Sequence, residues 1–254
     1  RIRTVCPGVK IVHLNVDPLS DTGNCDRIRN RVDHVDGIFI TTAGEALRPF
    51  SSRHTFAAFI PNPVDRAIDT GRAFAAESYS ADLFFAAGAM REDDHRKVMV
   101  SRILKEIPDM MIDIYGAGVN DRKIFGMAYM SALASAKMGL VINKTEDYYL
   151  YASDRMSQYM GNGLLVFAPA GPRYTDLFKD GECVTYESEQ DLIAKIKYYY
   201  EHDSERRILA EKGYRKIHEI FDVDRVARYM VDMTFGKNGN DMGYAWPTQI
   251  YRGT

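Results

Sequence analysis

One stretch, from Ser153 to Gly171, combines a helix, a tight turn and a buried strand, and it limits the fold more than any other part of the sequence. Ser153 suits an N-cap, because its hydroxyl can accept a hydrogen bond from an amide of the first turn, and Asp154 adds negative charge at the positive helix end. The segment 161–163, Gly-Asn-Gly, ends the helix, since both residue types tolerate the left-handed conformation. The run 164–167, Leu-Leu-Val-Phe, predicts a parallel strand covered on both faces.

Apolar runs typical of strands alternate with helical patterns along most of the chain. The expected strands are 9–16, 37–42, 55–60, 81–87, 111–115, 138–143, 164–167 and 183–186. The main expected helices are 93–107, 127–135, 153–161, 190–202, 205–221 and 222–235. In the helix 93–107 we expect Val98, Ile103 and Leu104 to face inward. This alternation predicts an α/β fold with a doubly wound, parallel, Rossmann-like sheet.

Two prolines, Pro61 and Pro63, force an extended exit from the third expected strand and mark a boundary. We divide the chain into residues 1–65, a linker 66–80, a complete Rossmann-like domain 81–235, and a tail 236–254 that turns aromatic. The first part holds only about three strands, too few for a whole domain of this kind, and the chain begins with Arg1 rather than Met. We therefore expect it to be the C-terminal part of an N-terminal Rossmann-like domain, or a reduced one.

Composition excludes several classes of protein. The net charge of -2 gives no basic footprint for nucleic acid. No apolar run approaches the roughly 20 residues that span a bilayer, and no signal peptide is recognisable. Cys6, Cys25 and Cys183 lack metal-ligand spacing and indicate reduced thiols in a cytoplasmic protein. Peripheral contact with a membrane stays open.

The helix start at Ser153 also carries the strongest indication of a binding site. A helix start with Ser153, Asp154 and Arg155 on the rim of a parallel sheet predicts an anion site, which we interpret as the site of a nucleotide diphosphate. Gln158 shares a helix face with Arg155, so it can bond to ribose hydroxyls. The alternative is that Arg155 and Gln158 brace neighbouring loops.

A second candidate for phosphate contact follows the first strand of the second domain. Gly88 lets the backbone come close to a phosphate, and Arg91 and Arg96 can neutralise a diphosphate. The alternative is a surface turn with solvated charges.

The segment 115–118, Tyr-Gly-Ala-Gly, is similar to part of a dinucleotide fingerprint. The complete motif is absent, because Asp121 stands where the last glycine is required, so a dinucleotide site is not expected. We expect a base or sugar to lie against Tyr115 and Gly116, or else an ordinary turn at a strand end.

Asp17 is the candidate for acid–base catalysis, because it follows a strand at the edge where open α/β sheets bind ligands. His13 and His54 are weaker candidates, since a single histidine near a strand is more often packed or exposed. The sequence holds no nucleophile elbow, P-loop, zinc-protease motif or D-x-D pair, so we expect no metal.

Four passages together resemble GT-B glycosyltransferases, especially the spore-maturation-type branch. They are 59–65 (FIPNPVD), 84–93 (FFAAGAMRED), 153–171 (SDRMSQYMGNGLLVFAPAG) and the segment 177–217. The resemblance implies two Rossmann-like domains that face each other across a cleft, with the donor on the second and the acceptor on the first. It implies that Gly88, Ser153, Arg155 and Gln158 line the donor site.

The resemblance further implies that the C-terminal segment crosses back onto the first domain. Many relatives carry Glu at the position of Gln158 and a second Glu earlier in the chain. Here the earlier segment, 149–151, reads Tyr-Leu-Tyr and has no acid.

We therefore expect a glycosyltransferase that moves a hexosyl or related sugar from a nucleotide-diphosphate donor to a hydroxyl of a polysaccharide, glycan or other glycoconjugate. Arg155, with Arg91 or Arg96 and the amides at Ser153, would stabilise the leaving diphosphate without a metal or other cofactor. Two alternatives stay open. One is a non-catalytic nucleotide-sugar-binding or scaffolding protein, and the other is a sugar-nucleotide epimerase on the same fold.

Overall fold

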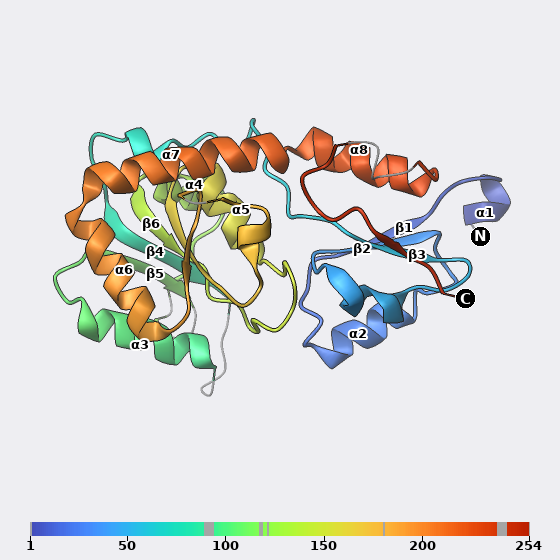
Figure 1. Ribbon diagram of the computed structural model, residues 1–254, viewed down its shortest axis with the longest axis horizontal. Coiled ribbons are helices and arrows are strands. Elements are labelled where there is room, and N and C mark those ends of the chain that lie inside the picture. Colours follow the sequence, from blue (N-terminus) through green and yellow to red (C-terminus); the bar gives the residue numbers. More distant parts are fainter. Residues whose placement is uncertain are drawn as a thin grey trace.

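The computed structural model describes residues 2–88, 94–116, 119–120, 122–179, 181–237 and 243–253. Two sheets lie side by side along the long axis of the molecule, each with helices on both faces (Figure 1). Their strand orders are β1-β2-β3-β9 and β5-β4-β6-β7-β8. This is the α/β architecture with parallel sheets that the alternating sequence pattern predicts. We call the two halves the first lobe and the second lobe.

The first lobe is built on three parallel strands and one antiparallel strand. These are β1 (Val12–Asn15), β2 (Gly37–Ile40), β3 (Phe56–Phe59) and β9 (Ile250–Tyr251), of which β9 pairs antiparallel to β3. Helix α1 (Ile2–Val5) precedes the sheet, and α2 (Thr22–Arg29) and the 3-10 helix η1 (Gly44–Phe50) lie below it in Figure 1. The expected strands are shorter in the structure, and β1 ends at Asn15, two residues before Asp17.

The second lobe holds five strands, all parallel. They are β4 (Ala81–Ala87), β5 (Ile112–Gly116), β6 (Ala136–Leu140), β7 (Leu165–Pro169) and β8 (Val184–Tyr186). Its helices are α3 (His95–Glu106), α4 (Gly126–Ala134), α5 (Asp154–Gly161), α6 (Glu189–Glu201) and α7 (Asp203–Ile220), with the 3-10 turns η2 (Ala73–Ala75) and η3 (Tyr174–Asp176). The chain goes from β4 outward to β5 on one side and then to β6 on the other side of β4, so the strand order reverses there. Open α/β sheets bind ligands at the carboxyl edge of such a switch point.

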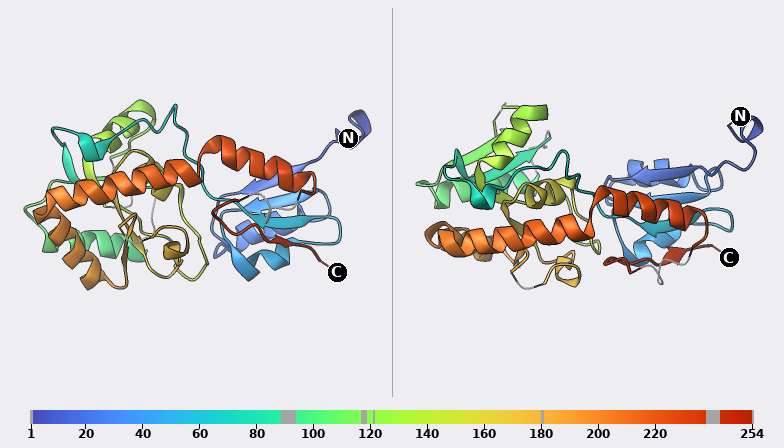
Figure 2. Two further views of the ribbon diagram at one scale, coloured as in Figure 1. Left: turned by 45° about the horizontal axis from the view of Figure 1, so that its top comes forward. Right: turned by 90° about the horizontal axis from the view of Figure 1, so that it is seen from above.

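The chain passes between the lobes twice, once near Val64 and once near Asp222, and these two segments lie side by side. The backbone amide of Val64 donates to the Phe221 carbonyl at 2.9 Å, and the amide of Val223 donates to the Val64 carbonyl at 2.9 Å. Beyond this point α8 (Val223–Thr234) continues from α7 onto the first lobe (Figure 2). There Tyr229 packs against Phe39 of the sheet, and Trp246 of the tail packs against Tyr229.

Helix α3 corrects one expectation about the core. It buries Met99, Val100 and Ile103, whereas Val98 is 59% exposed and Leu104 is also exposed. The expectation for Val98 and Leu104 was wrong because both apolar side chains lie beside the buried stripe of the helix rather than on it.

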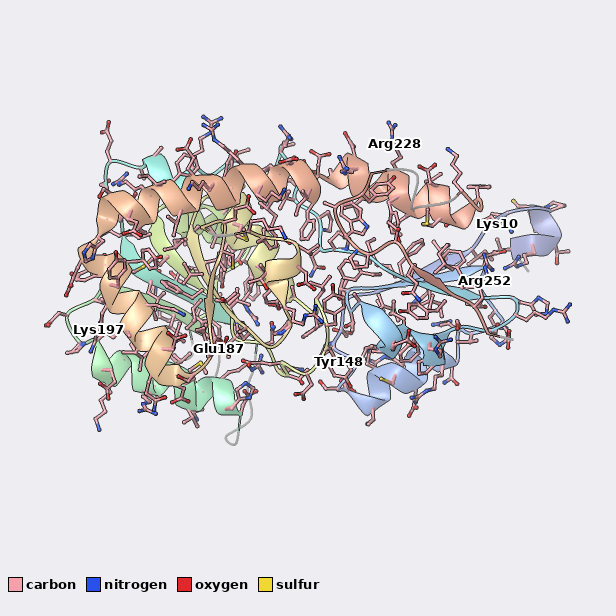
Figure 3. The ribbon with its side chains drawn as sticks, viewed as in Figure 1. Lys10, Tyr148, Glu187, Lys197, Arg228 and Arg252 are labelled. Atoms are coloured by element: carbon pink, nitrogen blue, oxygen red, sulfur yellow. The ribbon has the colours of Figure 1, made fainter. Side chains whose placement is uncertain are left out.

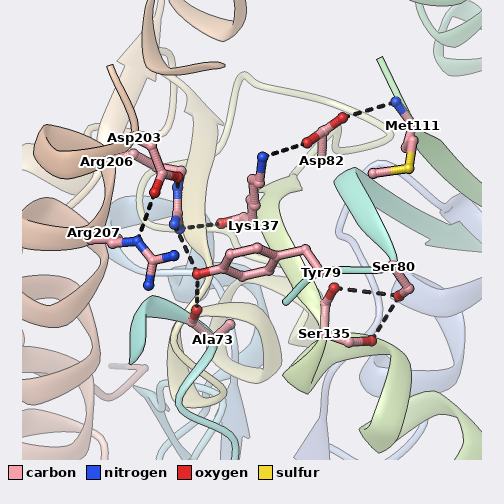
Figure 4. Close-up of polar contacts among 10 residues, drawn as sticks. All are labelled: Ala73, Tyr79, Ser80, Asp82, Met111, Ser135, Lys137, Asp203, Arg206 and Arg207. Atoms are coloured by element: carbon pink, nitrogen blue, oxygen red, sulfur yellow. Dashed lines mark hydrogen bonds and ion pairs between the residues drawn. The ribbon is translucent and has the colours of Figure 1, made fainter. Parts of the chain in front are cut away.

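A buried charged network fixes α7 at the amino ends of β4 and β6 (Figure 4). The guanidinium of Arg206 is fully buried, and it donates to Asp203 at 2.7 Å, to the Tyr79 hydroxyl at 3.0 Å and to the Lys137 carbonyl at 3.2 Å. The Tyr79 hydroxyl in turn donates to the Ala73 carbonyl at 2.6 Å. Because these contacts lie at the edge opposite the carboxyl ends of the strands, we assign the network to stability.

Candidate functional site

The start of α5 lies at the carboxyl edge of the second sheet. Nη2 of Arg155 donates to the carbonyl of Ile142, just beyond β6, at 2.9 Å. The guanidinium carbon is 5.6 Å from the ring centroid of Phe85 on β4. Arg155 therefore sits beside the two strands where the order reverses, which is the position that a parallel sheet offers to a ligand.

Two polar groups at this helix start have no partner among the described residues. Ser153 Oγ and Arg155 Nε are both enclosed, and neither makes a hydrogen bond. Ser153 occupies the N-cap position, with φ -70° and ψ 157°, but the expected capping bond from its hydroxyl is not formed. An enclosed polar group without a partner costs about 1–3 kcal/mol. A bound anion would recover part of this cost if the atoms that cover these two groups moved aside and let its oxygens reach them.

Helix α5 is held against the sheet by Tyr159. This side chain is fully buried, and its hydroxyl accepts a hydrogen bond from the Ala86 amide at 3.2 Å. Gly139 of β6 makes room for the ring, because a Cβ there would lie 2.6 Å from it. Asp154 in the first turn is exposed. The site is thus carried by a helix whose distance from the sheet is fixed.

Gln158, on the next turn of α5, is half-buried. Its Oε1 accepts a hydrogen bond from the Tyr129 hydroxyl at 2.7 Å, so the amide group of the side chain is the part that remains for a ligand. Tyr129 comes from α4, and burial is the main reason that its pKa lies far above the ordinary value. It therefore stays protonated and donates.

Gly88 and Gly116 end neighbouring strands. Among the described residues, a Cβ at Gly88 would meet no atom within 4 Å apart from its chain neighbours. Gly116 has φ +67°, and a Cβ there would lie 2.4 Å from the Ala87 carbonyl oxygen, so only glycine fits.

The Tyr115 hydroxyl is bonded to Asp113 and Arg122, at 2.9 Å each. Burial, followed by the bond to Asp113, raises the pKa of Tyr115.

Arg96 is buried and already paired. Its Nε and Nη2 bond to the carboxylate of Asp94 at 2.8 and 2.5 Å, and Asp94 also caps α3 by accepting from the Arg96 amide at 3.0 Å. The side-chain hydrogen bond from Arg96 is the main cause that lowers the pKa of Asp94 to about 2. Arg91, the other expected cation, lies outside the described residues, so the predicted role of both arginines stays a prediction.

Asp17 stands on the first lobe, just past β1. Its side chain is 64% exposed and lies 3.9 Å from Nη2 of Arg27. His13 is half-buried, and burial is the main reason that its pKa is lowered, while His54 lies on an exposed loop. The carboxylate of Asp17 is one of the charges that act on the phenol of Tyr151, which belongs to the second lobe. The role expected for Asp17 in acid–base catalysis stays a prediction.

The two lobes meet at the loop before α5. The Ala43 amide of the first lobe donates to the Tyr149 carbonyl at 2.9 Å, and Asn62 Nδ2 donates to the Ala152 carbonyl at 3.0 Å. Tyr148, on the same loop, is labelled at this junction in Figure 3. A cavity of about 20 Å³ lies between the lobes, lined by Asn62 among others, and it is large enough for one water.

Sequence reasoning missed Tyr151 and Glu146 in this loop. Tyr151 is buried at the junction. Glu146 is half-buried, and burial raises the pKa of its carboxyl, although the charge of His95 opposes this rise. The only sequence signal was their position in the loop between β6 and α5.

Within the described ranges, no three His, Cys, Asp or Glu residues gather closely enough to hold a metal ion, and no helix has the length and apolar character needed to cross a membrane.

Several solved structures are similar to this chain. TarM of S. aureus superposes with a TM-score of 0.65 at 14% identity, covering 90% of this chain and 51% of TarM. HepE of Anabaena, solved with UDP and glucose, gives a TM-score of 0.64 at 12% identity, covering 89% of this chain and 72% of HepE. Sucrose-phosphate synthase of Thermosynechococcus elongatus gives 0.56 at 13% identity, covering 87% and 66%. The chain thus spans about half the length of TarM, and these likenesses show the GT-B fold.

A search among curated protein sequences found no match. The sequence model of the family described as "Glycosyl transferase-like" matches residues 91–232, from just after Gly88 to the last turn of α8. Because this match covers more than half of the chain, the chain belongs to the glycosyl transferase-like family.

Proposed function

We propose that this protein transfers a sugar from a nucleotide-diphosphate donor to an acceptor hydroxyl. One observation carries the proposal: Ser153 Oγ and Arg155 Nε are enclosed and unpartnered, among the described residues, at a helix start on the carboxyl edge of the sheet. Amides, a hydroxyl and a guanidinium in one place are the groups that bind a diphosphate. The membership in the glycosyl transferase-like family supports this assignment.

The chemistry we propose depends on the leaving group. Negative charge develops on the diphosphate as the bond to the sugar breaks, and donors fixed in advance stabilise it without reorganisation. Arg155 is held by the Ile142 carbonyl and Ser153 occupies the N-cap position, so both residues already lie at the site, and only the atoms that cover Ser153 Oγ and Arg155 Nε have to move aside for the donor. We propose that these groups, with Gln158 toward the ribose, make a metal unnecessary. Asp17 is our candidate base if the reaction inverts.

The finer assignment is also a proposal. The four sequence passages favour the spore-maturation-type branch, and we propose a hydroxyl of a polysaccharide, glycan or other glycoconjugate as the acceptor. HepE was solved with UDP and glucose, so UDP is the first nucleotide to test. The three cysteines are free thiols, which supports a reducing compartment such as the cytoplasm.

Calorimetric titration of UDP, GDP and ADP into wild type and Arg155→Ala tests the site. We expect one nucleotide to bind, and Arg155→Ala to weaken that binding by about tenfold or more, as loss of a charge-assisted hydrogen bond implies. Arg102→Ala is the matched control, because Arg102 pairs with Glu189 on the surface between α3 and α6. Equal affinity in wild type and Arg155→Ala would remove Arg155 from the site.

Chromatography of the donor after incubation separates the remaining alternatives. A transferase releases nucleotide and consumes acceptor, or slowly hydrolyses the donor without one. An epimerase changes the sugar while the nucleotide stays attached, and a scaffolding protein binds the donor but leaves it unchanged.

A further inference from the structure

The segment 149–152, Tyr-Leu-Tyr-Ala, ties the two lobes together at the start of α5. Tyr149 accepts a backbone hydrogen bond from the first lobe on one side of Tyr151, and Ala152 accepts one from Asn62 on the other side. Between them Leu150 has φ +54°, a rare conformation for this residue type, and its amide donates to the Pro172 carbonyl at 2.8 Å. The surrounding structure therefore determines the conformation of the segment closely.

Tyr151 is the fixed centre of this segment. Its carbonyl accepts hydrogen bonds from the Tyr174 hydroxyl and from Asn143 Nδ2, the latter at 3.3 Å. Asn143 directly follows Ile142, whose carbonyl holds Arg155. Two consecutive residues beyond β6 thus place Tyr151 and Arg155 at the same strand end.

The ring of Tyr151 is buried, with only 5% of the residue exposed. Its hydroxyl makes no hydrogen bond to any described residue. Unlike Ser153 Oγ, this hydroxyl is not fully enclosed by the described residues. A buried tyrosine normally finds a partner for its hydroxyl. Because it is not fully enclosed, the Tyr151 hydroxyl can take a partner beyond the described residues.

Charges from both lobes act on this phenol. Burial is the main reason that its pKa rises to about 12, Arg155 and Arg96 oppose the rise, and Asp17 of the first lobe adds to it. At neutral pH the phenol keeps its proton and is a hydrogen-bond donor that lies beside a guanidinium.

We propose that the Tyr151 hydroxyl donates a hydrogen bond to a diphosphate oxygen of the donor, next to the sugar that is transferred. This inference rests on the proposed function and adds a ligand-contacting residue on the loop that links the lobes. A neutral donor there complements Arg155, because it reaches the same anion from the side of the first lobe. The loop would thereby make the diphosphate site sensitive to how the lobes are placed.

The test compares UDP and UMP binding to wild type, Tyr151→Phe and Tyr148→Phe by calorimetry. We expect Tyr151→Phe to weaken UDP binding by about tenfold and UMP binding by less than about twofold, because only the second phosphate loses its contact. Tyr148→Phe, on the same loop and half-buried, should leave both affinities unchanged. The thermal midpoint of Tyr151→Phe should stay within about 2 °C of wild type, since the hydroxyl that is removed bonds to no described residue.

Unchanged UDP affinity in Tyr151→Phe would overturn the inference while the proposed function stands. Equal losses for UDP and UMP would also overturn it, because they indicate a contact to the nucleoside or a change in the fold. If wild type binds no nucleotide at all, the proposed function is rejected and this inference with it.

Discussion

The Tyr129 hydroxyl donates a hydrogen bond to Oε1 of Gln158 at 2.7 Å, and this bond decides which face of the amide a ligand can meet. With Oε1 occupied, Gln158 presents N–H groups, whereas the Glu of many relatives would present oxygen. Ribose hydroxyls can accept from these N–H groups. If Gln158 contacts the ribose, as we propose, the departure from the family pattern changes the direction of that hydrogen bond rather than removing it.

Tyr129→Phe should weaken nucleotide binding by about three- to tenfold, because the amide of Gln158 loses the bond that orients it. Calorimetry with UDP and with 2′-deoxy-UDP measures the effect. In wild type the deoxy analogue should bind more weakly, and in Tyr129→Phe this difference should shrink. Tyr200→Phe, on the distant helix α6, is the control. A deoxy penalty of the same size in both proteins would place Gln158 away from the ribose.

Gly139→Ala should destabilise the protein by about 1–3 kcal/mol, because the new Cβ would overlap the Tyr159 ring that holds α5. Gly88→Ala is the matched comparison: the new Cβ would meet no described residue within 4 Å beyond its chain neighbours, and the φ of Gly88 is not left-handed, so stability should change by less than about 0.5 kcal/mol. Urea unfolding gives both values. If Gly88 approaches a phosphate, Gly88→Ala will still weaken UDP binding, and unchanged affinity would remove this residue from the site.

Arg206→Ala should cost about 3–5 kcal/mol of unfolding free energy, because it leaves Tyr79 and the Lys137 carbonyl without their buried partner. Arg215→Ala removes an exposed pair with Glu211 and should cost less than about 1 kcal/mol. Equilibrium unfolding in urea compares the two. Similar small losses in both variants would show that the network around Tyr79 contributes little.

Asp94→Asn should destabilise the protein near neutral pH by about 2–3 kcal/mol, because the carboxyl pKa is about 2 in the folded state and about 4 in the unfolded state. A depressed folded pKa contributes stability above the unfolded pKa, and this contribution is lost as the pH falls from about 4 to about 2. The gap between wild type and Asp94→Asn should therefore close over that range. Asp26→Asn, at an exposed pair with Arg29, is the control. A gap that persists at the lowest pH would contradict the assignment to the Arg96 pair.

Much of the fold could be predicted because local signals agree with each other. The run 81–87 is one strand in the structure, with its core-facing residues buried. Asp94, Ser188 and Asp222 begin helices, and each side chain accepts the capping bond that its residue type favours. These features depend on neighbours within a few residues, which a sequence displays directly.

The contacts between distant segments could not be predicted in the same way. Nothing local to Ala43 indicates that its amide bonds to Tyr149, and nothing near Ser153 indicates that its hydroxyl has no partner among the described residues. Tyr151 was not singled out, because the charges that the two lobes bring near its phenol lie far from it in the sequence. The residue types of the site were recognisable, but their partners required the three-dimensional structure.

A crystal structure of the protein with UDP tests the central claim most directly. We predict the diphosphate within hydrogen-bonding distance of Arg155 Nε and Ser153 Oγ, at the start of α5. UDP bound elsewhere, with both groups still unpartnered, would contradict the account.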